Sequence, residues 1–279
     1  MPRPQIALAP AAAPVYPRHM LTQITHGTVT DRPTLVIVHG LFGSARNWGA
    51  IARRLSETRR VVAVDMRNHA NSPWAPSQSY PEMAADLAEV IAALGAPIDL
   101  LGHSMGGKAA MVLALTRAEL VNRLVVADIA PVAYGHDQTP LIDAMRGLDL
   151  AGLTTRLEAD RRLAAAVADP ATRAFLLQSL DLKASPPRWR LNLDVLEAEM
   201  AKLVGWPEIA GRFEGPALFL TGALSSYVQP EHRAKIKALF PQARFAKLPG
   251  AGHWLHADRP REFEAAVEVF LTAAASSAP

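Results

Sequence analysis

Short apolar runs alternate with amphipathic segments along most of this chain. The runs from Thr34 to His39, from Arg60 to Asp65 and from Ile98 to His103 are almost continuously apolar. Such runs are typical of strands that are covered on both faces, as in a parallel sheet. Between them, the segments from Asn47 to Ser56 and from Glu82 to Leu94 repeat apolar residues at helical spacing. This alternation predicts an α/β fold with a doubly wound, mostly parallel sheet.

The same alternation extends toward both ends of the chain. A first strand is expected from Met20 to Gly27, and later strands from Arg123 to Asp128, from Ala217 to Gly222 and from Ala243 to Leu248. Helices are expected from Pro230 to Phe240 and from Arg259 to Ala275, where apolar residues recur at helical spacing. These segments would extend the same sheet and supply the helices that cover it.

One long segment interrupts this pattern. Residues 132–212 contain no convincing strand and are rich in Ala, Leu and Arg at helical spacing. A helical insertion directly after the strand that ends at Asp128 would lie over the carboxyl ends of the strands, where open α/β sheets bind ligands. The sequence therefore predicts a core domain of residues 20–131 and 213–279, with a helical cap of residues 132–212. Residues 1–19, which are rich in Ala and Pro, are expected to form a disordered leader.

Composition excludes several functional classes. The 279 residues are 50% hydrophobic, which is enough for a large core, and the net charge of +3 comes from scattered arginine pairs, so no nucleic-acid partner is expected. The chain has no cysteine, which excludes disulfides, thiolate catalysis and Cys-ligated zinc. It has neither an H-E-x-x-H motif nor a G-x-G-x-x-G motif at the first βα unit. We therefore expect no metal and no organic cofactor.

The N-terminal apolar stretch from Ile6 to Val15 is broken by Pro10 and Pro14. It makes a poor signal peptide and is too short to span a bilayer. The sequence therefore favours a cytoplasmic location without a membrane span.

The segment Gly102-His103-Ser104-Met105-Gly106 is a G-x-S-x-G motif between a predicted strand and a helix-favouring run. A serine on such a sharp strand-to-helix turn exposes its hydroxyl, and the glycines allow close backbone approach. Free N–H groups at the start of the following helix favour a developing negative charge. The pattern is typical of a nucleophile elbow and indicates an acyl-transfer enzyme with Ser104 as its nucleophile.

A serine nucleophile needs a base, which a carboxylate orients. His253 is the best candidate for the base, because it lies in a glycine-rich loop after the last predicted strand and follows the serine in chain order. His256, near the start of the next helix, is expected to form hydrogen bonds or to cap that helix.

An oxyanion hole needs two backbone donors. Met105 follows the nucleophile and would supply one of them. Leu41, in the loop after the strand from Thr34 to His39, would supply the other, and His39 is expected to anchor that loop by hydrogen bonds.

Several motifs together make the chain resemble the α/β-hydrolase superfamily, and more narrowly the YbfF-type bacterial esterases and their animal α/β-hydrolase-domain relatives. They run from about residue 30 to the C-terminus and are VHGLFGSARNW (38–48), VDMRNHANSP (64–73), GHSMGGKAAM (102–111), ADIAPVAY (127–134), WRLNLD (189–194) and GAGHWLHADRP (250–260). The resemblance implies an α/β-hydrolase fold and hydrolysis of small-molecule carboxylic or thio esters with short to medium acyl chains, without a cofactor. Ala70 departs from the pattern, since the family usually has Gly there.

The acid of the triad is less clear than the base. Most α/β-hydrolases place it after the strand that follows the cap, but here no carboxylate follows Gly222 before Glu231. Asp128 is our prediction, because it ends the strand next to the nucleophile's own βα unit and would emerge at the same edge of the sheet. Asp194 is the runner-up, because relatives of this group carry a matching residue.

Two other readings remain open at the level of sequence. Cofactor-free haloperoxidase or perhydrolase activity and carbon–carbon bond hydrolysis use the same fold and triad. A non-catalytic binding protein of this fold would commonly lack the nucleophile or the base. Haloalkane dehalogenases and epoxide hydrolases need a carboxylate nucleophile where this chain has Ser104.

Overall fold

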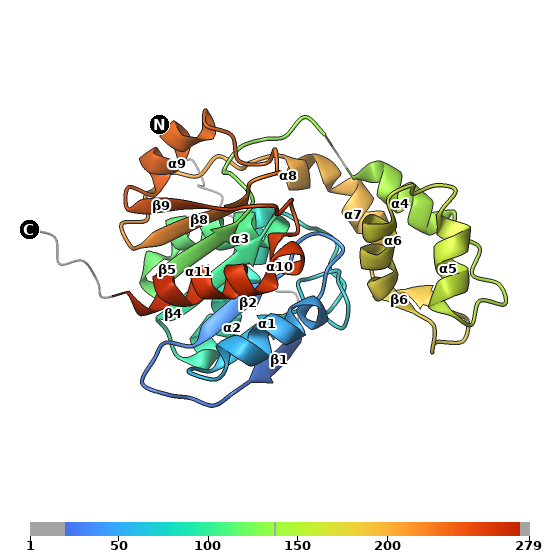
Figure 1. Ribbon diagram of the computed structural model, residues 1–279, viewed down its shortest axis with the longest axis horizontal. Helices are drawn as coiled ribbons and strands as arrows, with labels where there is room; N and C mark the ends of the chain where they lie inside the picture. Colours follow the sequence, from blue (N-terminus) through green and yellow to red (C-terminus); the bar gives the residue numbers. More distant parts are fainter. Residues whose placement is uncertain (1–19, 137, 274–279) are drawn as a thin grey trace, which may run out of the picture.

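The computed structural model describes residues 20–136 and 138–273 (Figure 1). The strands are β1 (Gln23–His26), β2 (Leu35–Val38), β3 (Val61–Val64), β4 (Ile98–His103), β5 (Val121–Ala127), β6 (Leu180–Asp181), β7 (Arg188–Trp189), β8 (Ala217–Gly222) and β9 (Ala243–Leu248). The α-helices are α1 (Gly49–Leu55), α2 (Tyr80–Leu94), α3 (Met105–Thr116), α4 (Thr139–Arg146), α5 (Arg156–Leu163), α6 (Pro170–Leu176), α7 (Leu193–Ala198), α8 (Met200–Val204), α9 (His232–Leu239), α10 (Leu255–Asp258) and α11 (Pro260–Thr272). Short 3₁₀ helices span Ala45–Trp48, Ala118–Leu120 and Leu177–Ser179. The predicted leader and the predicted end of the last helix at Ala275 lie outside the described residues.

The central sheet has seven strands in the order β1-β3-β2-β4-β5-β8-β9. Strand β1 is antiparallel to β3, and every other neighbouring pair is parallel. The prediction of a mostly parallel sheet is therefore confirmed. Because β5 lies between β4 and β8, the loops that follow these three strands meet at one edge of the sheet.

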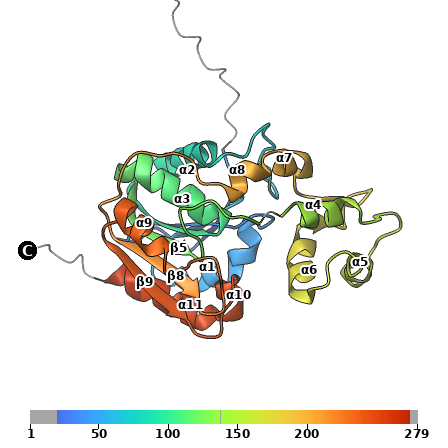
Figure 2. The ribbon, with the colours of Figure 1, turned by 90° about the horizontal axis from the view of Figure 1, so that it is seen from above.

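Helices cover both faces of the sheet, as the view from above shows (Figure 2). Alternate side chains of a strand point to opposite faces. In β2, Val36 and Val38 pack in the cluster formed with α2 and α3, while Leu35 and Ile37 pack in the cluster formed with α1 and α11. This two-sided burial explains why the strands read as continuous apolar runs.

We call residues 132–212 the cap segment. Its helices α4 to α7 extend to one side of the sheet (Figures 1 and 2), and α8 lies at the N-terminal ends of α2 and α3, where Tyr80 and Lys108 contact it. The expectation that this segment has no strand is wrong, because β6 and β7 pair antiparallel, with Leu180 opposite Trp189. Two-residue strands are too short to produce a recognisable alternation in the sequence.

Candidate active site

Ser104 lies on a tight turn between β4 and α3. Its backbone has φ 52° and ψ −119°, a sparsely populated conformation that the surrounding contacts hold in place. This tight turn requires glycine at two positions. A Cβ on Gly102 would lie 2.3 Å from the carbonyl oxygen of Gly106, and a Cβ on Gly106 would lie 2.5 Å from the carbonyl oxygen of His39. The backbone therefore presents the Ser104 side chain at the carboxyl edge of the sheet, where it lines a cavity.

The structure brings Ser104, His253 and Asp128 into one hydrogen-bonded chain. The Oγ of Ser104 is 3.0 Å from Nε2 of His253, and Nδ1 of His253 is 2.8 Å from Oδ2 of Asp128. Asp128 is fully buried and also accepts hydrogen bonds from the backbone N–H of Gly222 and from the Ser225 hydroxyl. All the polar contacts of this carboxylate therefore hold it in the orientation that faces His253.

Two residues that the sequence analysis did not single out fix the position of His253. Nε2 of His103 lies 2.9 Å from the backbone carbonyl oxygen of His253. Burial, together with the nearby His253 and His256 rings, lowers the pKa of His103 well below its ordinary value, so His103 acts as a neutral donor. The ring of Tyr227 stacks on the His253 ring at a centroid distance of 3.9 Å. Tyr227 comes from the loop after β8, where no carboxylate was found.

Asp194 is not part of this arrangement. It lies on α7 with its side chain 89% exposed, and it pairs with Arg146 at 2.7 Å. Between the two carboxylates considered from the sequence, only Asp128 contacts His253.

The loop after β2 orients the amide of Leu41. The carbonyl oxygen of Gly40 accepts hydrogen bonds from Nδ1 of His39 at 2.8 Å and from the N–H of Gly43 at 3.0 Å. In a trans peptide the N–H points away from the carbonyl, so these two bonds also fix the direction of the Leu41 N–H. Among the described residues, the N–H groups of Leu41 and Met105 have no hydrogen-bond partner, and both residues line the cavity beside Ser104.

Two buried histidines support this loop. Nε2 of His39 accepts from the N–H of Met66 at 2.9 Å, so the expectation that His39 anchors the loop by hydrogen bonds is confirmed. Nε2 of His69 accepts from the N–H of Phe42 at 3.2 Å. Burial is the main cause that lowers the pKa of His39 to about 4 and that of His69 to about 3, so both rings are neutral over the physiological range.

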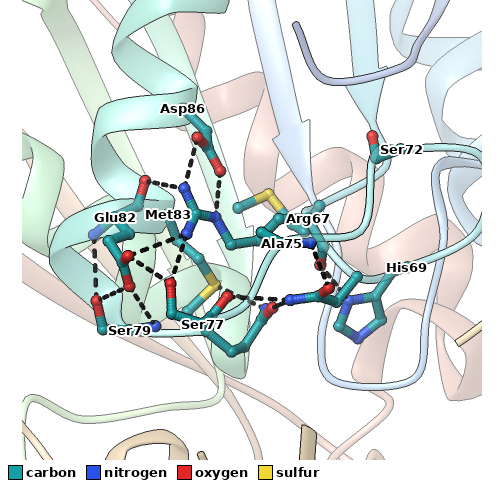
Figure 3. Close-up of polar contacts among 12 residues, drawn as sticks. Arg67, His69, Ser72, Ala75, Ser77, Ser79, Glu82, Met83 and Asp86 are labelled. Carbon is teal, nitrogen blue, oxygen red and sulfur yellow. Dashed lines mark hydrogen bonds and ion pairs between the residues drawn. The ribbon is translucent and has the colours of Figure 1, made fainter. Parts of the chain in front are cut away.

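Polar contacts also hold the loop around His69 in place (Figure 3). Arg67 forms a bidentate ion pair with Asp86 on α2, and the N–H of Ala75 donates to Asn68. Ala70 adopts φ 49°, a left-handed conformation in which an alanine costs about 1–2 kcal/mol and a glycine is relaxed. Its N–H donates to the backbone carbonyl oxygen of Arg190 in the cap segment at 2.7 Å, so this strained residue is hydrogen-bonded to the cap segment.

Replacing His69 with glutamine is expected to weaken the pH dependence of stability. The folded-state pKa of about 3 lies below the ordinary 6.5, so the stability contributed by neutral His69 is present above pH 6.5 and is lost as the pH falls toward 3. Each such proton changes the unfolding free energy by about 1.4 kcal/mol per pH unit within that window. Urea unfolding between pH 7 and pH 5 should therefore give a flatter slope for the variant, and parallel slopes would contradict the assignment.

His256 differs from its expected role. It forms no hydrogen bond with the described residues, and its Nδ1 is buried without a partner. Instead its ring stacks on Trp48 at a centroid distance of 4.1 Å. Sequence position near a helix start suggested a polar role, but the aromatic neighbour comes from residues far away in the chain.

The cavity in front of Ser104 has a volume of about 270 Å³. Apolar side chains from the core and from the cap segment form most of its wall, and they include Leu41, Ile129, Leu141, Phe175, Met200, Leu203 and Trp254. Lys108 is the one lysine, arginine, aspartate or glutamate among the described residues that line it. The cavity therefore suits an uncharged, largely apolar group next to the serine hydroxyl.

No group of three or more His, Asp or Glu side chains in residues 20–136 and 138–273 is placed to hold a metal ion. No helix in these residues is long and apolar enough to cross a membrane.

Comparisons with known proteins agree with this geometry. The family model described as alpha/beta hydrolase fold matches residues 33–260. The chain is 43% identical to the sn-1-specific diacylglycerol lipase of Mus musculus, over 86% of this chain and 81% of that protein. It is 38% identical to esterase YbfF of Escherichia coli K12, over 85% of this chain and 92% of that protein. A solved structure titled marine microorganism esterase superposes with a TM-score of 0.85 at 36% identity, covering 91% of this chain and all of that one. The chain therefore belongs to the α/β-hydrolase fold family and is a relative of the YbfF-type esterases within it.

Proposed function

We propose that this enzyme hydrolyses carboxylic or thio esters of short to medium acyl chains through an acyl-enzyme intermediate on Ser104. The observation that carries the proposal is the hydrogen-bonded chain from Asp128 through His253 to Ser104, which ends at the cavity. Relatives that are named esterases and a lipase support ester hydrolysis as the reaction.

The geometry supports a two-step acyl transfer. In the first step, Nε2 of His253 takes the proton of the Ser104 hydroxyl as Oγ attacks the ester carbonyl carbon. The tetrahedral oxyanion would accept hydrogen bonds from the N–H groups of Leu41 and Met105, which have no partner in the described residues. The imidazolium then gives its proton to the leaving alcohol or thiol. In the second step His253 activates water, which attacks the acyl-enzyme and regenerates the Ser104 hydroxyl.

The buried carboxylate of Asp128 has a positioning and an electrostatic part in this scheme. By accepting from Nδ1 of His253 it leaves Nε2 as the base, and it stabilises the imidazolium that forms after proton transfer. The backbone N–H of Gly222 and the Ser225 hydroxyl keep this carboxylate in place while the ring changes its charge.

Cavity size and chemistry support the choice of acyl group. At about 270 Å³ the cavity is slightly smaller than the range of roughly 300–1,000 Å³ that is usual for small-molecule sites. Its apolar wall favours an aliphatic acyl chain, and its size favours a short or medium one. The mouse relative is named as a diacylglycerol lipase, so glycerol esters of such acids belong among the substrates to be tested.

Trapping of the acyl-enzyme tests the proposal. Rapid mixing with excess p-nitrophenyl butyrate should give a burst of p-nitrophenol, and intact-protein mass spectrometry should show one added butyryl group. Peptide mass spectrometry after digestion should place this group on Ser104. A panel of p-nitrophenyl esters of increasing chain length, run beside acyl-CoA thioesters, then ranks the substrates. If hydrolysis proceeds while no acyl adduct forms on Ser104, a covalent mechanism on this residue is wrong.

The alternative reactions would use the same catalytic residues but consume different substrates. Perhydrolysis would consume hydrogen peroxide with the acyl-enzyme, and carbon–carbon hydrolysis would need a ketone substrate in the cavity. A non-catalytic role fits poorly with a nucleophile and a base that lie 3.0 Å apart. We therefore place ester hydrolysis first.

A further inference from the structure

The ammonium group of Lys108 is buried in the wall of the acyl cavity, and the reaction proposed above gives it no role. Lys108 is 1% exposed, and no carboxylate among residues 20–136 and 138–273 pairs with it. Burial lowers the pKa of Lys108 to about 7, and the charge of Lys235 acts in the same direction. A buried cation without an anion is costly unless other polar groups compensate it.

The groups that compensate it belong to the end of α8. The Nζ of Lys108 donates to the carbonyl oxygen of Val204 at 3.0 Å and to that of Gly205. Nζ also lies 4.8 Å from the ring centroid of Tyr134 and 5.4 Å from that of Tyr80. Carbonyls in the last turn of a helix have no intrahelical partner, so a cation placed there stabilises them.

Two other groups, one from α2 and one from the start of the cap segment, hold the same end of α8. The Tyr80 hydroxyl donates to the carbonyl oxygen of Leu203, and the N–H of Tyr134 donates to that of Val204 at 3.0 Å. The carbonyls of three consecutive residues therefore all accept hydrogen bonds from groups outside α8. We call these three donor groups, from Tyr80, Lys108 and Tyr134, the α8 clamp.

This clamp joins the nucleophile to the opposite wall of the cavity. Lys108 follows Ser104 by four residues, which is about 6 Å along a helix axis. The side chains of Met200 and Leu203 on α8 line the cavity that Ser104 also faces. A displacement of α8 would therefore change the depth of the cavity.

We infer that Lys108 is a specificity-determining positioning residue, which fixes the α8 wall of the acyl cavity and thereby maintains the surface that binds the distal part of a longer acyl chain. The inference rests on the proposed function, since it concerns the acyl group of the same reaction. Both hydrogen bonds that the Lys108 ammonium forms with the described residues go to backbone carbonyls. Lys108 therefore influences substrate binding indirectly, through the position of α8.

Lys108→Met tests this role, because methionine keeps the length of the apolar stem and removes the donors. We expect KM for p-nitrophenyl octanoate to rise roughly tenfold or more, since a long chain needs the α8 wall in place. The kcat/KM for p-nitrophenyl acetate should stay within about threefold, because a two-carbon acyl group occupies only the region next to Ser104. Tyr80→Phe removes one bond of the same clamp and should shift the chain-length profile in the same direction by a smaller factor.

Lys202→Met is the matched control. Lys202 also lies on α8, but its side chain is 58% exposed and its ammonium bonds to Glu199. This variant should keep the wild-type profile. Hydrogen–deuterium exchange of the peptide that covers residues 200–206 provides a readout independent of activity, and we expect faster exchange in Lys108→Met than in Lys202→Met. Tyr80→Phe supplies both readouts if Lys108→Met fails to fold.

Several outcomes would overturn the inference. If Lys108→Met loses equal activity toward p-nitrophenyl acetate and p-nitrophenyl octanoate, Lys108 does not fix the α8 wall. The same conclusion follows if neither activity changes and hydrogen–deuterium exchange of residues 200–206 is also unchanged. A selective loss with mono-p-nitrophenyl glutarate, while neutral esters stay unaffected, would mean that the ammonium binds an acyl carboxylate instead. If the wild-type enzyme hydrolyses none of these esters, the proposed function fails, and the exchange comparison still decides whether Lys108 holds α8.

Discussion

Ser104→Ala is expected to lower kcat/KM for p-nitrophenyl butyrate by about 10⁴-fold or more, while the protein folds normally. The hydroxyl is the group that attacks the ester in the proposed mechanism, and it is the one hydroxyl among the described residues that forms a hydrogen bond with the His253 ring. Residual turnover would come only from substrate binding and the oxyanion amides. Steady-state kinetics on the purified variant measure the loss, and circular dichroism checks the fold.

Ser226→Ala is a suitable control for this experiment. Ser226 lies in the exposed part of the loop after β8, and its side chain forms no hydrogen bond with the described residues. It should keep wild-type kinetics. Near-normal turnover of Ser104→Ala would mean that another residue carries the chemistry, and the serine hydrolase proposal would then be wrong.

The strands of the mostly parallel sheet could be predicted because a physical pattern marks them in the sequence. Strands buried on both faces require mostly apolar residues. β2 and β3 are apolar over their whole length, while β4 also carries the polar residues Asp99 and His103. The sequence of the cap segment has no comparable pattern that would mark its strands. Its pair β6 and β7 depends on a contact between Leu180 and Trp189, which no local pattern encodes.

The site was predictable to the extent that topology determines it. Parallel neighbouring strands end at the same edge, so a serine after β4 and an aspartate after β5 must lie near each other. The supporting contacts could not be predicted. Tyr227 stacks on His253 because of the path of the loop after β8. Lys108 contacts α8 because the cap segment returns to the sheet at this point.

Lys108 illustrates this limit clearly. In α3 it lies within the run from Met105 to Leu115, all of which is buried, although a single lysine in the sequence suggests a solvated face. Its partners are backbone carbonyls almost a hundred residues away, and backbone carbonyls carry no signature in a sequence. A residue whose role depends on backbone groups of a distant segment can be found only from the fold.

Asp128→Asn is expected to lower kcat by roughly 10² to 10⁴-fold. An amide at this position cannot stabilise the imidazolium, and its NH₂ group would favour the wrong tautomer of His253. The geometry gives the reason for so large an effect, because the carboxylate is buried and lies 2.8 Å from Nδ1 of the base. Since substrate binding involves other residues, KM should change much less than kcat, and steady-state kinetics at one pH separate the two parameters.

Asp194→Asn provides the matched comparison, because it makes the same chemical change at the carboxylate that the sequence left as the alternative. Asp194 is 89% exposed and pairs with Arg146, and exposed ion pairs contribute about 0–1 kcal/mol to stability. Its replacement should therefore leave kcat within about twofold. A severe loss in Asp194→Asn with near-normal turnover in Asp128→Asn would reverse the assignment. It would also require the α7 region to move onto His253 during the reaction, since in the structure the bond to Nδ1 comes from Asp128 alone among the described residues.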